Sequence, residues 1–135
     1  MPDAKGQAVE TVRGYLRLVE ARDLDRAGAH LAPDATITFP GGRVFTSLPE
    51  QVASSANRFR SVTKTFDHFD EIRDGDRTIV YALGTLAGEA LDGSAFDSVR
   101  FIDRFVLRGG RITDHTVWND LAECGIVRPN PEDDT

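Results

Sequence analysis

The feature that most constrains the fold is a change in hydrophobic period partway along the chain. From Thr63 onward, apolar and polar residues alternate with a period of two, as in strands that bury one face. Gly-containing turns interrupt the alternation at Asp74-Gly75, Asp92-Gly93 and Gly109-Gly110. The pattern therefore predicts an antiparallel meander of four long strands. The expected strands are residues 63–73, 77–90, 95–108 and 111–119.

The first half of the chain has a helical period instead. Apolar residues from Ala8 to Val19 recur at helical spacing and predict an amphipathic helix of about five turns, with Tyr15 at the edge of its apolar stripe. A second, short helix is expected to begin after Asp23, its N-cap, and to end within about two residues of Pro33. These two helices should form a hairpin.

Two elements lie between the helical hairpin and the long strands. Residues 35–39 and 43–46 are typical of a short strand pair around a Gly-Gly turn. Ser47 and Glu50 then form a capping box ahead of an apolar stripe that includes Phe59, which predicts a third helix.

Helices followed by strands indicate an α+β domain. Gly84 and Gly88, inside the second long strand, favour a bend or bulge, so the sheet should curl. We expect a cone in which three helices from the N-terminal half pack on the concave side of a curved antiparallel sheet. One domain over residues 1–126 and a disordered acidic tail over 127–135 are expected.

Composition excludes several classes of function. The net charge of −6 argues against a nucleic-acid partner, and no apolar run is long enough to cross a membrane. The chain has one cysteine and no secretory signal, so we expect a cytoplasmic protein. We expect no cofactor, since no nucleotide-binding fingerprint is found. No metal is expected either, because His68 and Asp70 share a strand face without a third ligand.

An acidic residue interrupts the apolar face of the strand expected at 95–108. Period-two alternation places Asp103 on the same face as Phe101 and Phe105. A carboxylate among apolar groups loses several kcal/mol of hydration, so Asp103 must be paired, hydrogen-bonded or protonated. The pattern leaves these three alternatives open.

Other polar residues could join Asp103. His115, Val117 and Asn119 share one face of the last strand, although the pattern does not decide which face looks inward. If this face is inward, it brings an imidazole that titrates near neutral pH. Tyr15 could add a phenolic hydroxyl, or could be a core residue with its hydroxyl at the rim.

These residues and several short segments resemble the nuclear transport factor 2-like superfamily. This cone-shaped fold is shared by ketosteroid isomerases, SnoaL-type polyketide cyclases and limonene epoxide hydrolase. The resemblance covers about residues 8–125. It rests on the order of elements and on LRLVEARDLD after Tyr15, HLAPDATITFP and FIDRFVLRGGRI.

The resemblance implies roles for individual residues. Tyr15 matches the tyrosine, and Asp103 the protonated aspartic acid, that hold the enolate oxygen in ketosteroid isomerases. In those enzymes the aspartic acid stays neutral and donates a hydrogen bond to that oxygen. The catalytic base of those enzymes is replaced by Phe39, which cannot take a proton, so His115 is the best substitute base. The residues required for epoxide hydrolysis are absent.

The sequence therefore predicts a SnoaL-like enzyme that performs proton transfer on a small hydrophobic carbonyl compound. Tyr15, Asp103 and His115 are the expected catalytic residues, and a cavity on the order of a few hundred Å³ should reach them. The alternative is a non-catalytic ligand-binding protein of the same fold. A homodimer through the outer sheet face, where Ile102, Val106 and Trp118 lie, is expected in either case. The expected ligand-binding residues are Phe39, Phe59, Phe101, Phe105, Val117 and Asn119.

Overall fold

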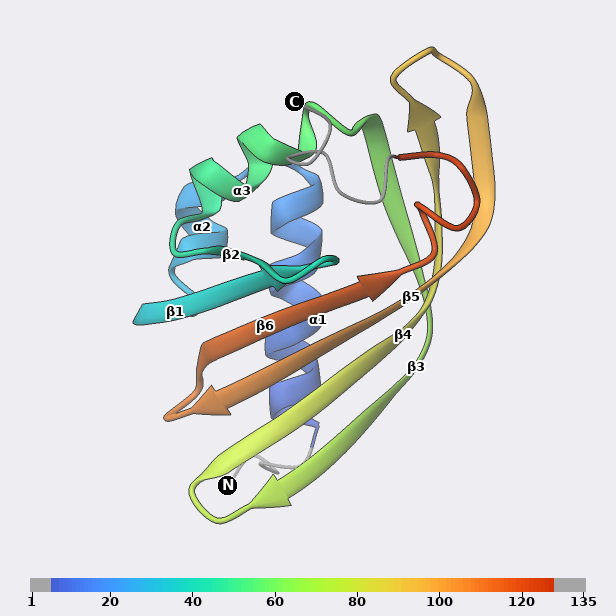
Figure 1. Cartoon of the computed structure of the whole chain (residues 1–135). Coiled ribbons are helices and arrows are strands. Elements are labelled where there is room, and N and C mark those ends of the chain that lie inside the picture. The colour runs from blue at the N-terminus through green and yellow to red at the C-terminus, as the bar shows by residue number, and fades with distance from the viewer. Residues whose placement is uncertain (1–5, 128–135) are drawn as a thin grey trace.

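The structure, a computed structural model, describes residues 6–127 and has three helices on one side of a curled six-stranded sheet (Figure 1). The helices are α1 (Gln7–Glu20), α2 (Leu24–Gly28) and α3 (Leu48–Ser55). The strands are β1 (Leu31–Phe39), β2 (Arg43–Phe45), β3 (Phe59–Asp74), β4 (Arg77–Ala90), β5 (Ala95–Arg108) and β6 (Arg111–Asn119). The strand order is β2-β1-β6-β5-β4-β3. The predicted α+β class and the helix-covered concave face are confirmed.

The predicted meander of β3 to β6 is confirmed, and it is extended by the first two strands. β1 pairs with β6 in parallel, the one parallel pair of the described sheet, and β2 pairs with the other side of β1. β1 begins at Leu31, earlier than expected, because Leu31 already pairs with Ile112 of β6. This early pairing also ends α2 at Gly28, several residues before Pro33.

Three other boundaries differ from expectation. α1 has 14 residues and so nearer four turns than five. Phe59 opens β3 instead of closing α3, because α3 ends at Ser55 and the chain then turns into an edge strand. Val127, assigned to the tail, is buried against the core, and the rest of the predicted tail lies outside the described residues.

The N-cap half of the predicted capping box at the start of α3 is confirmed. The Ser47 hydroxyl accepts a hydrogen bond from the backbone N–H of Glu50 at 3.2 Å. This bond satisfies a donor that has no partner within the helix.

We expect Ser47→Ala to lower the free energy of unfolding by about 1 kcal/mol, because it removes this cap. Urea denaturation measures the change. The adjacent exposed Thr46→Ala should change stability by less than about 0.5 kcal/mol. Equal effects of the two substitutions would contradict a capping role for Ser47.

The curl of the sheet comes from glycines and bulges in its middle strands. A Cβ on Gly84 would collide with the carbonyl oxygen of Thr65, and one on Gly88 with that of Ser61. Neighbouring strands therefore approach these glycines more closely than any side chain allows. Pairing shifts between Phe66 and His68 on β3, and between Leu86 and Gly88 on β4, mark bulges nearby.

The structure decides which face of β6 looks inward. His115 and Val117 are buried, 5% and 5% exposed, whereas Trp118 is 50% exposed. The pairing of β5 with β6 shifts between Val106 and Leu107, which places a bulge at Thr113 of β6. The bulge turns Ile112 inward, whereas simple alternation from His115 would turn it outward.

The outer sheet face is only partly as expected. Ile102 and Trp118 are paired in register and exposed, 39% and 50%, but Val106 is 6% exposed. The homodimer through this face stays a prediction.

None of the helices within residues 6–127 has both the length and the apolar character needed to cross a membrane.

Candidate active site

Asp103 lies at the centre of the sheet and is completely buried. Register places it between Ala82 of β4 and Val117 of β6, both of which face the same interior. Its exposed fraction is 0%. The predicted inward direction of this acidic side chain is therefore confirmed, and the first of the three alternatives, pairing, is the one that the structure adopts.

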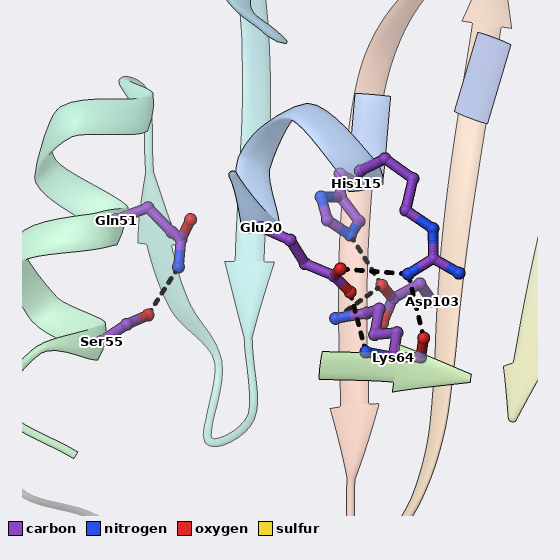
Figure 2. A network of polar contacts seen from close by, with 7 residues as sticks. Glu20, Gln51, Ser55, Lys64, Asp103 and His115 are labelled. Atoms are coloured by element: carbon purple, nitrogen blue, oxygen red, sulfur yellow. Dashed lines mark hydrogen bonds and ion pairs between the residues drawn. The ribbon is translucent and has the colours of Figure 1, made fainter. Parts of the chain in front are cut away.

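Two side chains, one from the adjacent strand β6 and one from the edge strand β3, approach one oxygen of Asp103 (Figure 2). The Nζ atom of Lys64, on β3, lies 3.7 Å from Oδ2, and the Nε2 atom of His115, on β6, lies 3.4 Å from the same oxygen. Neither carboxylate oxygen has a hydrogen bond of good geometry among the described residues, so the contact with Lys64 is that of an ion pair.

The pair with Lys64 determines the charge of Asp103. Burial by itself raises the pKa of the carboxyl group, but the positive charge of Lys64 and the contact with His115 outweigh it and hold the pKa below its ordinary value. Asp103 is therefore ionised at neutral pH. The resemblance implied a protonated acid at this position; that expectation is wrong here because Lys64 supplies a counter-ion.

Tyr15 and Phe105 fix the imidazole of His115. The ring of Phe105 stacks on it at 4.2 Å and 17°, and the ring of Tyr15 meets it edge-on at 5.7 Å. Burial and the negative charge of Asp103 raise the pKa of the Tyr15 phenol above its ordinary value. The Tyr15 hydroxyl therefore keeps its proton and can donate a hydrogen bond.

A cavity of about 80 Å³ opens beside this cluster. It has room for a few water molecules and is smaller than the few hundred Å³ expected from the sequence. Phe101, Phe105 and Asp103 are not in its wall, so Asp103 meets the cavity only through His115 and Lys64. The predicted residues that line it are Tyr15, Phe39, Phe59, His115, Val117 and Asn119.

The sequence analysis did not predict five polar residues of the wall, which are Glu20, Arg22, Gln51, Ser55 and Lys64. Lys64 lies on the inner face of β3, and Gln51 and Ser55 lie one turn apart on α3, where the Gln51 side-chain amide donates to the Ser55 hydroxyl at 2.8 Å (Figure 2). The sequence did contain a signal that Lys64 points inward, since it shares a strand face with the apolar Val62 and Phe66.

Lys64 is also anchored through its backbone. Its N–H donates to Glu20 Oε2 at 2.8 Å, and its carbonyl accepts from Arg17 Nη1 at 3.1 Å. The same Arg17 nitrogen lies 3.0 Å from Glu20 Oε1. These three contacts join the end of α1 to β3 at the position that carries the lysine.

The segment after β6 borders the cavity. Residues 121–125 form turns, and Cys124 is exposed. The Asp120 side chain pairs with Arg100, with Nε 2.7 Å from Oδ2. The Asn119 side chain accepts from the N–H of Leu121 at 3.2 Å, which fixes the rim of the cavity.

A curled sheet with three helices on its concave side and an inward Tyr, Asp and His defines a protein of the nuclear transport factor 2-like class. The family described as a SnoaL-like domain matches residues 12–115, and the chain belongs to that family. A comparison with functionally curated proteins finds no match.

Solved structures share the fold at low sequence identity. A nuclear transport factor 2-like protein of unknown function from Burkholderia pseudomallei is 24% identical, with a TM-score of 0.75 over 90% of this chain and 98% of that chain. TerC, co-crystallised with polyporic acid, is 19% identical with a TM-score of 0.72 over 89% and 97%. A protein from Shewanella frigidimarina assigned as a ketosteroid isomerase is 22% identical with a TM-score of 0.68 over 83% and 94%.

Proposed function

We propose that this protein catalyses proton transfer on a small hydrophobic carbonyl compound, in an isomerase, cyclase or dehydratase type of reaction. One observation carries the proposal: His115 lines the cavity while its Nε2 atom lies 3.4 Å from a buried, ionised carboxylate. A histidine oriented by a carboxylate is a common general base.

The orientation of His115 makes one of its nitrogens the base. Nε2 faces Asp103, so a proton on Nε2 points to the carboxylate and the neutral ring keeps its lone pair on Nδ1. Nδ1 is buried and has no hydrogen-bond partner among residues 6–127. Because Nε2 is directed at Asp103, Nδ1 is the nitrogen that we assign as the acceptor of the substrate's proton.

The proposed step breaks a C–H bond next to the substrate carbonyl and forms an N–H bond at Nδ1 of His115. The electron pair moves onto the carbonyl oxygen, which becomes an enolate anion. The Tyr15 hydroxyl, kept protonated by burial and by Asp103, donates a hydrogen bond to that oxygen. Return of the proton to another carbon atom completes an isomerisation. In a cyclisation, the enolate carbon forms a bond to a second carbonyl carbon of the substrate, and the oxygen of that carbonyl takes the proton from His115. In a dehydration, the hydroxyl group on the β-carbon takes the proton from His115 and leaves as water.

The cavity sets the size and polarity of the substrate. Phe39, Phe59 and Val117 give it an apolar wall, and a volume of about 80 Å³ restricts it to a molecule of few heavy atoms. The co-crystallisation of TerC with polyporic acid supports a small organic ligand for a protein of this fold.

Hydrogen exchange tests the proposal without knowledge of the natural substrate. Acetone, cyclopentanone and 2-cyclopentenone are incubated with the protein in D₂O, and NMR follows deuterium entry next to the carbonyl. The wild-type protein should accelerate entry into at least one ketone over buffer. His115→Gln should reduce that acceleration by about 10²–10⁴-fold, because a general base is lost.

His68→Gln is the matched control, since His68 is an exposed histidine on the outer part of the sheet. It should exchange at the wild-type rate. No acceleration by the wild-type protein, or equal acceleration by His115→Gln, would contradict the proposal. Binding of a ketone without any exchange would favour the alternative function, a non-catalytic ligand-binding homodimer.

A further inference from the structure

Lys64 is a cation in the cavity wall to which the proposed mechanism gives no part. We propose that the Lys64 ammonium is a second catalytic group, which binds the oxygen anion formed when the substrate loses its proton. Asp103 then serves as the fixed counter-ion of Lys64 and as the residue that orients His115. This inference rests on the proposed function and extends it to the group that stabilises the anion.

The side chain of Lys64 is half-buried, and its ion pair with Asp103 leaves hydrogen-bond donors of the ammonium unused. Its side chain is 18% exposed, and its Nζ lies 3.7 Å from Asp103 and 5.1 Å from the centre of the Phe101 ring. Charge-assisted hydrogen bonds between nitrogen and oxygen are about 2.7–2.9 Å long, so the contact with Asp103 is an ion pair and not a short hydrogen bond. The hydrogen-bond donors of Nζ therefore remain for a ligand in the cavity.

The lysine is held at its position before any ligand binds. Its backbone N–H donates to Glu20 of α1 at 2.8 Å (Figure 2), and its carbonyl accepts from Arg17 of the same helix at 3.1 Å. Donors that are held in place cost no reorganisation when negative charge develops, which makes them effective in catalysis.

The charges balance throughout the step. Before proton transfer, Lys64 is positive, Asp103 is negative and His115 is neutral. After transfer, the imidazolium of His115 and the enolate oxygen add one positive and one negative charge. Tyr15 offers the enolate only a neutral hydrogen bond, whereas Lys64 offers a full charge in a site with little water, where electrostatic attraction is strong.

Enolate binding tests this role without any turnover. The probe is 1,3-cyclopentanedione, which is an enolate at neutral pH, and cyclopentanone is its uncharged comparator of the same ring size. Calorimetry should show tighter binding of the enolate to the wild-type protein. Lys64→Met should weaken enolate binding by about 10-fold or more and leave cyclopentanone binding within about 2-fold, because only the charged contact is lost.

A double variant separates contact with the anion from simple neutralisation of Asp103. Lys64→Met/Asp103→Asn removes both charges, and it also keeps the test available if the single variant fails to fold. If Lys64 contacts the anion, the double variant binds the enolate as weakly as Lys64→Met. Recovery of wild-type enolate binding in the double variant would show that Lys64 only compensates Asp103 and would overturn the inference.

Two other outcomes also overturn it: wild-type protein with no preference for the enolate, and Lys64→Met with unchanged enolate binding. The deuterium experiment is independent of both. If the protein prefers the enolate through Lys64 but catalyses no deuterium exchange, the anion site is supported and only the proton-transfer proposal is contradicted.

Discussion

Replacement of Asp103 by leucine is expected to lower the free energy of unfolding by about 3–5 kcal/mol, because it leaves the ammonium of Lys64 without its counter-ion. Asp103 is 0% exposed and the Lys64 side chain 18%, so water replaces the lost partner only in part. Urea denaturation at pH 7 measures the loss. Asp70→Leu is the control, since Asp70 and its partner His68 are 63% and 57% exposed; it should cost less than about 1 kcal/mol.

The same residue gives a pH dependence whose direction is fixed. The pKa of Asp103 is lower in the folded state than in the unfolded chain, where a carboxyl group titrates near pH 4. Its contribution is therefore complete above about pH 4 and is lost as the pH falls toward the folded-state value, since the unfolded state binds the proton first. Asp103→Asn should lose stability less steeply than the wild type below about pH 4. Parallel curves would contradict an ionised Asp103.

The second large effect concerns the curl of the sheet. Gly84→Ala should destabilise the protein by about 1–3 kcal/mol or more, because a Cβ there meets the Thr65 carbonyl and the Phe101 ring and forces β3 or β5 to move. Thermal and urea unfolding measure the cost. The control is Gly14→Ala in the middle of α1, where a Cβ meets nothing within 4 Å.

This control should change stability in the opposite direction. Alanine is favoured over glycine inside a helix by up to about 1 kcal/mol, so Gly14→Ala is expected to stabilise the protein. A gain from both substitutions would show that Gly84 does not hold the strands at close approach.

The long strands were predictable because each has a clear period and a glycine turn at its end. The bounds 77–90, 95–108 and 111–119 agree with the structure. β3 was harder to place. Its alternation breaks at a bulge near Asp67, so Phe66 and Phe69 approach each other, with ring centres 5.1 Å apart, although they are three residues apart in sequence.

The candidate site was partly predictable for a similar reason. Asp103 is conspicuous as the acid on an apolar strand face, and Tyr15 and His115 follow from periodicity together with the family resemblance. The ionisation state of Asp103 was not predictable, since it depends on Lys64 from another strand. A lysine on an edge strand usually indicates a solvated face, and only the tertiary structure shows this one inside.

The parallel pairing of β1 with β6 has a consequence for biosynthesis. β1 ends at Phe39, but its partner strand does not begin until Arg111, so more than half of the described chain must be translated before β1 can pair with it. Until then the nascent chain exposes an open strand edge of β1 and lacks His115. Such long-range pairing slows folding and leaves the edge of β1 open to pairing with other chains while the polypeptide grows.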